Sequence, residues 1–193
     1  GDPMSRALSA ARRSPHFPLS PMMAPVPPAP TRLAELGTVL CLYHADSSEL
    51  AGWHQAVAVH ACQGVDSEGL RESLCFTDDR GRCCWRLYLL PDSDFLAWDR
   101  LVAELPGQSP GEAEGNVGER LWRRLAGHLR GQRWRVCALR LHASAGGQGL
   151  AASLAPLSSL GAVVARRIAR LEGAEMPLAE VDAGPRAPAL LRA

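Results

Sequence analysis

Hydrophobic and polar positions alternate along the chain in a way that predicts several β-strands. The clearest alternation is at 53–62, where every second residue belongs to the same face, which is the period of a strand. A dense apolar run at 39–43 and the stretch 134–142 predict two more strands. The two faces expected for 53–62 carry Trp53, Gln55, Val57 and Val59, and His54, Ala56, Ala58 and His60.

The most distinctive local pattern predicts a β-hairpin, with strands at 72–77 and 82–90. The turn between them contains Asp78 and Asp79, whose carboxylates can bond the turn backbone, and Gly81, which can adopt a positive φ. We expect one face of this hairpin to meet the core. The apolar residues expected on that face are Leu74, Phe76, Trp85, Leu87 and Leu89.

Four segments have the spacing or the capping residues of helices. Thr31 is expected to cap a short helix that ends at Leu36, and Asp92 or Ser93 to cap one that ends near Leu105. Further along, 119–130 is amphipathic, and 150–172 is expected to be mainly helical, with its stronger part at 161–171. Within the second helix the apolar side chains at spacings of three and four are Phe95, Trp98, Val102 and Leu105.

Together these elements predict an α+β fold, in which an antiparallel β-sheet packs against helices. A single domain is expected at 31–175, with a linker near 106–118 that is rich in glycine, proline and glutamate. The proline-rich residues 1–30 predict a disordered tail, and 176–193 predict a flexible C-terminal tail.

Composition narrows the class of protein. All 21 basic residues are arginine, which indicates a GC-rich bacterial genome, and the net charge of +1 predicts no general attraction to nucleic acid. No apolar run reaches the about 20 residues that span a bilayer, so we expect a cytoplasmic protein without membrane insertion. The six cysteines lack the Cys-x-x-Cys spacing of zinc or thioredoxin-like sites, and we expect reduced thiols.

The middle of the chain resembles the haemin-degrading HemS/ChuX family of bacterial haem-utilisation proteins. The residues that carry the resemblance are 53–59 (WHQAVAV), 69–81 (GLRESLCFTDDRG), 87–89 (LYL), then Trp98, Leu101 and Val102, with 36–40 (LGTVL) upstream. The order is similar to one half of such a protein, in which a tryptophan-containing strand precedes a hairpin and a covering helix. The resemblance implies a truncated HemS/ChuX-like sheet that binds or traffics haem.

The chain departs from the family in ways that affect this expectation. Only about a dozen residues separate Leu40 from Trp53, so several strands of the family's sheet are expected to be missing. Residues 107–193 do not resemble a second half, and no haem ligand transfers by motif.

A haem site needs an axial donor, an apolar slot and cations for the propionates. The candidate cofactor-binding residues are His54, His60, Tyr88 and Arg86, and the candidate metal ligands are the two histidines. On one strand these histidines would lie about 20 Å apart, so each would act alone. The alternatives are partly buried, hydrogen-bonded histidines and a tyrosine that covers a sheet edge with its hydroxyl in water.

A cluster of arginines offers a second kind of candidate site. It could hold propionates, phosphates or RNA, or it could be the solvated face of a helix, balanced by Glu112, Glu114 and Glu119. The cluster consists of Arg120, Arg123, Arg124, Arg130, Arg133, Arg135 and Arg140.

No catalytic motif is recognised: the sequence has no glycine-rich phosphate loop and no His-Glu-x-x-His. Its Gly-x-Ser-x-Gly string at 107–111 (GQSPG) falls in the expected linker and not in the strand-to-helix elbow of a hydrolase. The first hypothesis is therefore a non-enzymatic accessory protein of bacterial haem or iron use, with haem or a haem-handling protein as its partner. The alternative is a haem-free interaction module that uses the arginine-rich helix and a sheet face left open by the missing strands. A homodimer is compatible with both.

Overall fold

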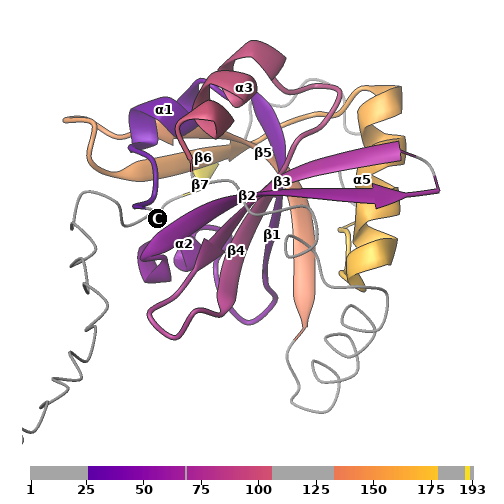
Figure 1. The fold of residues 1–193 in the computed structure, drawn as a ribbon, viewed down its shortest axis with the longest axis horizontal. Coiled ribbons are helices and arrows are strands. Elements are labelled where there is room, and N and C mark those ends of the chain that lie inside the picture. The colour runs from indigo at the N-terminus through magenta and orange to yellow at the C-terminus, as the bar shows by residue number, and fades with distance from the viewer. Residues whose placement is uncertain (1–25, 68, 106–132, 178–189, 192–193) are drawn as a thin grey trace, which may run out of the picture.

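Among the residues that the structure describes, seven strands form one antiparallel sheet at the centre (Figure 1). The computed structural model describes residues 26–67, 69–105, 133–177 and 190–191. The spatial order is β2-β3-β4-β1-β5-β6-β7. The strands are β1 (Thr38–His44), β2 (Ala58–Asp66), β3 (Gly69–Thr77), β4 (Cys83–Tyr88), β5 (Trp134–Ala143), β6 (Leu150–Leu154) and β7 (Leu190–Leu191).

Helices pack on both faces of this sheet, which confirms the predicted α+β class. The helices are α1 (Pro30–Ala34), α2 (Ala51–Gln55), α3 (Phe95–Ala103) and α5 (Ser159–Glu172). Figure 1 shows α1 and α3 together on one side of the sheet and α5 on another. Within the described residues, no helix is both long and apolar enough to cross a bilayer.

The first face of the sheet packs against α1, α2 and α3. The predicted hairpin is confirmed: Leu74 pairs with Leu87 and Phe76 with Trp85, so these apolar side chains share one face. The rings of Phe76 and Trp85 lie 4.9 Å apart between centroids, and both side chains are fully buried. Trp98 of α3 belongs to the same core, as the sequence pattern predicts. The apolar face expected to be open is therefore covered by helices.

The second face packs against α5. Ala165 and Ile168 of this helix join a smaller core with Leu40, Leu42 and Tyr88 of the sheet. Burial of these apolar side chains is the main contribution to the free energy that stabilises the packing of α5 on the sheet.

A capping contact fixes where α5 begins. The hydroxyl of Ser158 accepts a bond from the Gly161 N–H, and Asp92 accepts bonds of 2.7 Å from both the N–H and the hydroxyl of Ser158. A Cβ at Gly161 would collide with the Asp92 carboxylate, so the close approach requires a glycine. The helix start is thereby tied to the loop after β4.

The prediction of a strand at 53–62 is wrong for the first half of this range. Trp53 and His54 belong to the short helix α2, and the strand begins only at Ala58. The indole of Trp53 lies near Phe76 and Trp85, with ring centroids 6.1 and 6.3 Å away. Packing of Trp53 against the core therefore overrides the local alternation.

The helix expected at 150–172 begins later. Residues 150–154 form β6, because a short apolar run is ambiguous between strand and helix and pairing with β5 decides it. Helix α5 then starts beyond Pro156. Strands β5 and β6 thus extend the same sheet as the hairpin.

Two expected caps also differ. Helix α1 begins with Pro30 after Ala29, without a side-chain cap from Thr31. Helix α3 is capped by Asp94, which accepts from the Ala97 N–H at 2.9 Å, because Asp92 and Ser93 hold other loop contacts. The expected linker at 106–118, the helix at 119–130 and most of both tails lie outside the described residues.

Candidate functional site

The four predicted site residues fall into two places in the structure. His54 lies exposed in α2, whereas His60 lies on β2 with a partly buried side chain. Arg86 and Tyr88 lie on β4. The structure therefore separates His54 from the other three, because residues 53–55 are helical.

The other three residues lie on one face of three neighbouring strands. His60 pairs with Cys75, and Cys75 pairs with Arg86, which makes one row across β2, β3 and β4. The next row runs from Cys62 through Ser73 to Tyr88. Side chains alternate between faces, so both rows point to the side of the sheet that carries α5. We call these six residues the polar patch: His60, Cys62, Ser73, Cys75, Arg86 and Tyr88.

A buried hydrogen-bond chain holds one end of the polar patch to α5. The Tyr88 hydroxyl donates to Glu172 Oε1 at 2.6 Å, and Arg86 Nη1 donates to the Tyr88 oxygen at 3.4 Å. Tyr88 is fully buried and Arg86 is 4% exposed. A buried guanidinium requires a countercharge, and Glu172 supplies a carboxylate nearby.

Electrostatics keep these groups in fixed protonation states. Burial raises the pKa of the Tyr88 hydroxyl, Arg86 lowers it and Glu172 raises it, with a net rise. Burial opposes the charge of Arg86, but Tyr88, two thiols and Glu172 raise its pKa, with a net rise. Tyr88 therefore stays a neutral donor with its hydroxyl inside the protein, and in this arrangement it bonds a carboxylate rather than a metal ion.

Thiols surround the arginine, a feature that the sequence alone did not predict. Contact with Cys62 raises the pKa of Cys75, as does burial, while Cys83 and Arg86 lower it, and the net effect is a rise. Cys75 is therefore a protonated thiol at neutral pH rather than an activated nucleophile. Spacing in the sequence could not reveal this group, because strand register alone brings Cys62, Cys75 and Cys83 together.

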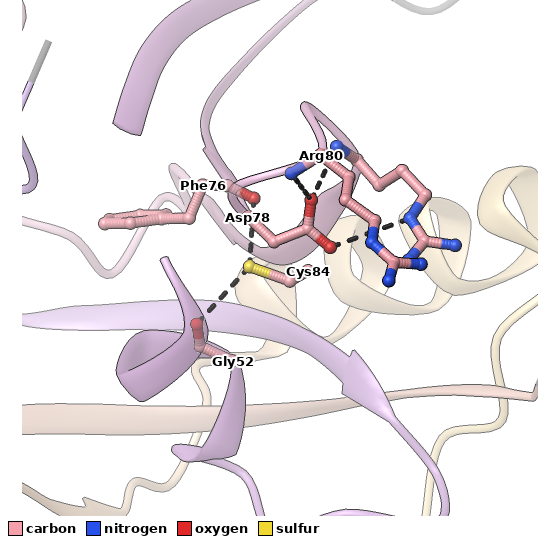
Figure 2. Close-up of polar contacts among 6 residues, drawn as sticks. Gly52, Phe76, Asp78, Arg80 and Cys84 are labelled. Atoms are coloured by element: carbon pink, nitrogen blue, oxygen red, sulfur yellow. Dashed lines mark hydrogen bonds and ion pairs between the residues drawn. The ribbon is translucent and has the colours of Figure 1, made fainter. Parts of the chain in front are cut away.

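The remaining thiol of the hairpin, Cys84, faces the interior. Figure 2 shows Cys84 Sγ between the carbonyl oxygens of Gly52 and Phe76, at 3.4 and 3.5 Å. Burial raises the pKa of Cys84 to about 12. In the described part of the chain, no group of three His, Cys, Asp or Glu side chains has the arrangement of a metal site.

The same view shows how the hairpin turn is built. The Asp78 carboxylate accepts bonds of 2.9 Å from the backbone N–H groups of Arg80 and Arg82 (Figure 2). Gly81 adopts φ 75°, the left-handed conformation that the turn requires. The turn aspartate therefore has a structural role, as its position in the sequence predicts.

A cavity of about 510 Å³ lies near α1 and β5, away from the polar patch. Its polar lining includes Glu35, Asp92, Asp94, Arg140 and His142. Its volume suits a small ligand. However, Asp94 caps α3, Asp92 accepts from Ser158, which caps α5, and His142 Nε2 lies 2.8 Å from the Ser153 hydroxyl. The two aspartates and His142 therefore have partners within the fold. None of the four predicted haem-site residues lines the cavity, whereas Arg140 of the predicted arginine cluster does.

The described arginines of the predicted cluster do not gather on one face. Arg135 and Arg140 lie five residues apart on β5, so they point to opposite faces of the sheet. Arg135 forms an ion pair of 3.6 Å with Glu175. The other members except Arg133 lie outside the described residues.

Comparison with protein-family models, with curated proteins and with solved structures finds no match for this chain.

Proposed function

We propose that the protein is a cytoplasmic accessory protein of bacterial haem or iron use, which binds haem or passes it on. The proposal rests on the resemblance of the middle of the chain to HemS/ChuX proteins. The order of the elements there, with β2 before the β3–β4 hairpin and then α3, is consistent with it, although Trp53 lies in α2 and not on the strand. No catalytic role is proposed.

The observation that carries the proposal is the position of His60. Its imidazole is partly buried on the outermost strand of the described sheet, next to Cys75 and two strands from Arg86. A haem iron needs a neutral imidazole that it can reach from solvent, and a nearby cation favours the propionates. Tyr88 and Arg86 are inside the protein, so His60 is the member of the polar patch best placed to meet a ligand.

A haemin titration tests the proposal. We expect the Soret band to shift and to saturate at one haem per chain, at a haem concentration close to that of the protein. Serum albumin and a protein without haem affinity serve as positive and negative controls. A spectrum that equals the sum of free haemin and protein at every ratio would exclude this function.

A second function is favoured by a specific observation at the edge of the sheet. Val65 on β2 pairs with Leu70 on β3, and these side chains are 78% and 59% exposed. Val57, which precedes β2, is 53% exposed. Val65 and Leu70 are adjacent, whereas Val57 lies at the other end of β2. Adjacent, exposed apolar side chains are typical of interaction surfaces, so the alternative proposal is a haem-free interaction module.

A further inference from the structure

Strand β2 is the outermost strand on one side of the sheet. Among the described strands it has β3 as its only neighbour, and at nine residues it is longer than a typical strand (Figure 1). Residues 58–65 contain no proline, lysine, arginine, aspartate or glutamate. Proteins usually protect an edge strand with such residues, because unpaired backbone groups there attract another strand.

The register shows which backbone groups face outward. Leu89 donates to Glu72, so the even-numbered residues of β3 bond to β4 and the odd-numbered residues bond to β2. The odd-numbered residues 71 and 73 pair with Gly64 and Cys62. The outward N–H and C=O groups of β2 therefore belong to its odd-numbered residues: Val59, Ala61, Gln63 and Val65.

We propose that β2 pairs in antiparallel register with β2 of a second copy of this chain, about a two-fold axis at Ala61. Ala61 then lies opposite Ala61, and Val59 lies opposite Gln63 of the second copy. These pairs use the outward backbone groups of both strands. The result is a continuous sheet with an isologous interface, the commonest kind in homodimers.

The side chains are self-complementary in this register, which favours a second copy over an unrelated strand. Val65 of each copy reaches the other copy's Val57, which lies just before β2 with its N–H bonded to Thr77, so the two exposed valines can cover each other where the ladder ends. An axis at Cys62 would instead place Val65 opposite Val59, which is already buried, and would leave Val57 in solvent. No like charges lie opposite each other between 58 and 65.

The interface also extends the polar patch. In this register His60 lies opposite Cys62 of the second copy, on the face that carries the patch. The second copy thus supplies a thiol beside the histidine. The dimer does not depend on haem, so it can exist whether or not the proposed function is correct.

Sedimentation velocity of the full chain, from micromolar to several hundred micromolar, tests the proposal. We expect a monomer–dimer equilibrium. Gln63→Pro removes an outward N–H and leaves the backbone bonds to β3 in place, but it also removes the exposed bond of 3.2 Å from Gln63 Nε2 to Glu72 Oε1. Val65→Lys keeps that bond and places a charge in the interface. Each should raise the dissociation constant at least tenfold, while circular dichroism and the melting temperature show a folded chain.

The matched control is Leu160→Lys, which removes another exposed apolar side chain, 62% exposed, at the start of α5. This variant should dimerise like the wild type. A wild type that stays monomeric, or a dimer that both β2 variants leave unchanged, would overturn the proposal.

Cross-linking tests the axis itself. Cα atoms of directly opposed, hydrogen-bonded residues lie about 5.5 Å apart, within the range that a disulfide spans. Oxidised glutathione should therefore link two Ala61→Cys chains, as the two thiols lose two protons and two electrons and two glutathione thiols form. The wild type should give no linked dimer. Linkage of the wild type through Cys62 would contradict the Ala61 axis.

Discussion

Tyr88 and Arg86 show what a residue pattern can and cannot predict. Alternation along 82–90 predicts that Tyr88 points to the opposite face of the strand from Trp85 and Leu87. The structure confirms this, because Trp85 and Leu87 belong to the larger core and Tyr88 to the smaller core on the other face. The sequence could not predict that α5 would cover the other face, because Glu172 lies 84 positions further along the chain. A residue expected at an open edge thus became part of the interior.

The bond between Tyr88 and Glu172 should contribute measurably to stability. We expect Tyr88→Phe to lower the free energy of unfolding by about 1–3 kcal/mol, because the partly buried Glu172 carboxylate loses the hydrogen bond from the Tyr88 hydroxyl. Urea unfolding checks this. Tyr43→Phe is the control, since Tyr43 lies in the other core, and it should change stability by less than about 1 kcal/mol. Equal effects of the two variants would contradict the structural role of the bond.

His44 should make stability depend on pH. Its ring stacks on Trp134, with centroids 3.8 Å apart, and burial lowers the pKa of His44 in the folded state. The unfolded chain then binds the proton more readily, so stability is present above the ordinary pKa of about 6.5 and falls as the pH drops through the folded pKa. The variant His44→Phe keeps an aromatic ring against Trp134 but has no side-chain group that binds a proton.

Unfolding free energies of the wild type and His44→Phe, measured from pH 8 to pH 5, check this. The stability of the wild type should decrease more steeply with falling pH than that of the variant. Parallel curves would show that His44 does not contribute.

At the scale of elements, local sequence patterns predict structure correctly where the two pairing strands are neighbours in the sequence. The hairpin at 69–88 has its own turn and forms as predicted. Residues 53–55 and 150–154 were assigned to the wrong element, because their structure depends on contacts with β4 and β5. The rows of the polar patch likewise depend on strand register, so the thiols beside Arg86 could not be predicted from spacing.

Gly52 lies where α2 packs against β4, the contact that overrides the alternating pattern at 53–55. A Cβ at this position would collide with the Cys84 carbonyl and lie 2.6 Å from the Trp85 Cβ. We expect Gly52→Ala to lower the free energy of unfolding by about 1–3 kcal/mol, because the helix must move away from the sheet. Ala51→Ser, at the neighbouring and less buried position, should change it little. Thermal and urea unfolding of both variants check this, and a fully stable Gly52→Ala would show that α2 does not pack so closely.

At the scale of the whole molecule, the described residues form one sheet with a helix-covered core on each face, and β2 is an outermost strand among the described strands. The sequence predicted the α+β class because hydrophobic periodicity reports which residues are buried. It did not predict the seven-strand order, since antiparallel strands from distant segments pair by tertiary contacts. The edge brings His60 to the margin of the polar patch, which is where the proposed haem site lies.

Haemin affinity of two histidine variants tests this proposal most directly. His60→Ala should weaken haemin binding at least tenfold, measured from the Soret titration, because it removes the proposed axial donor. His54→Ala, on exposed α2, should bind haemin like the wild type. Equal binding by His60→Ala and the wild type, or a loss confined to His54→Ala, would contradict a haem site at the polar patch.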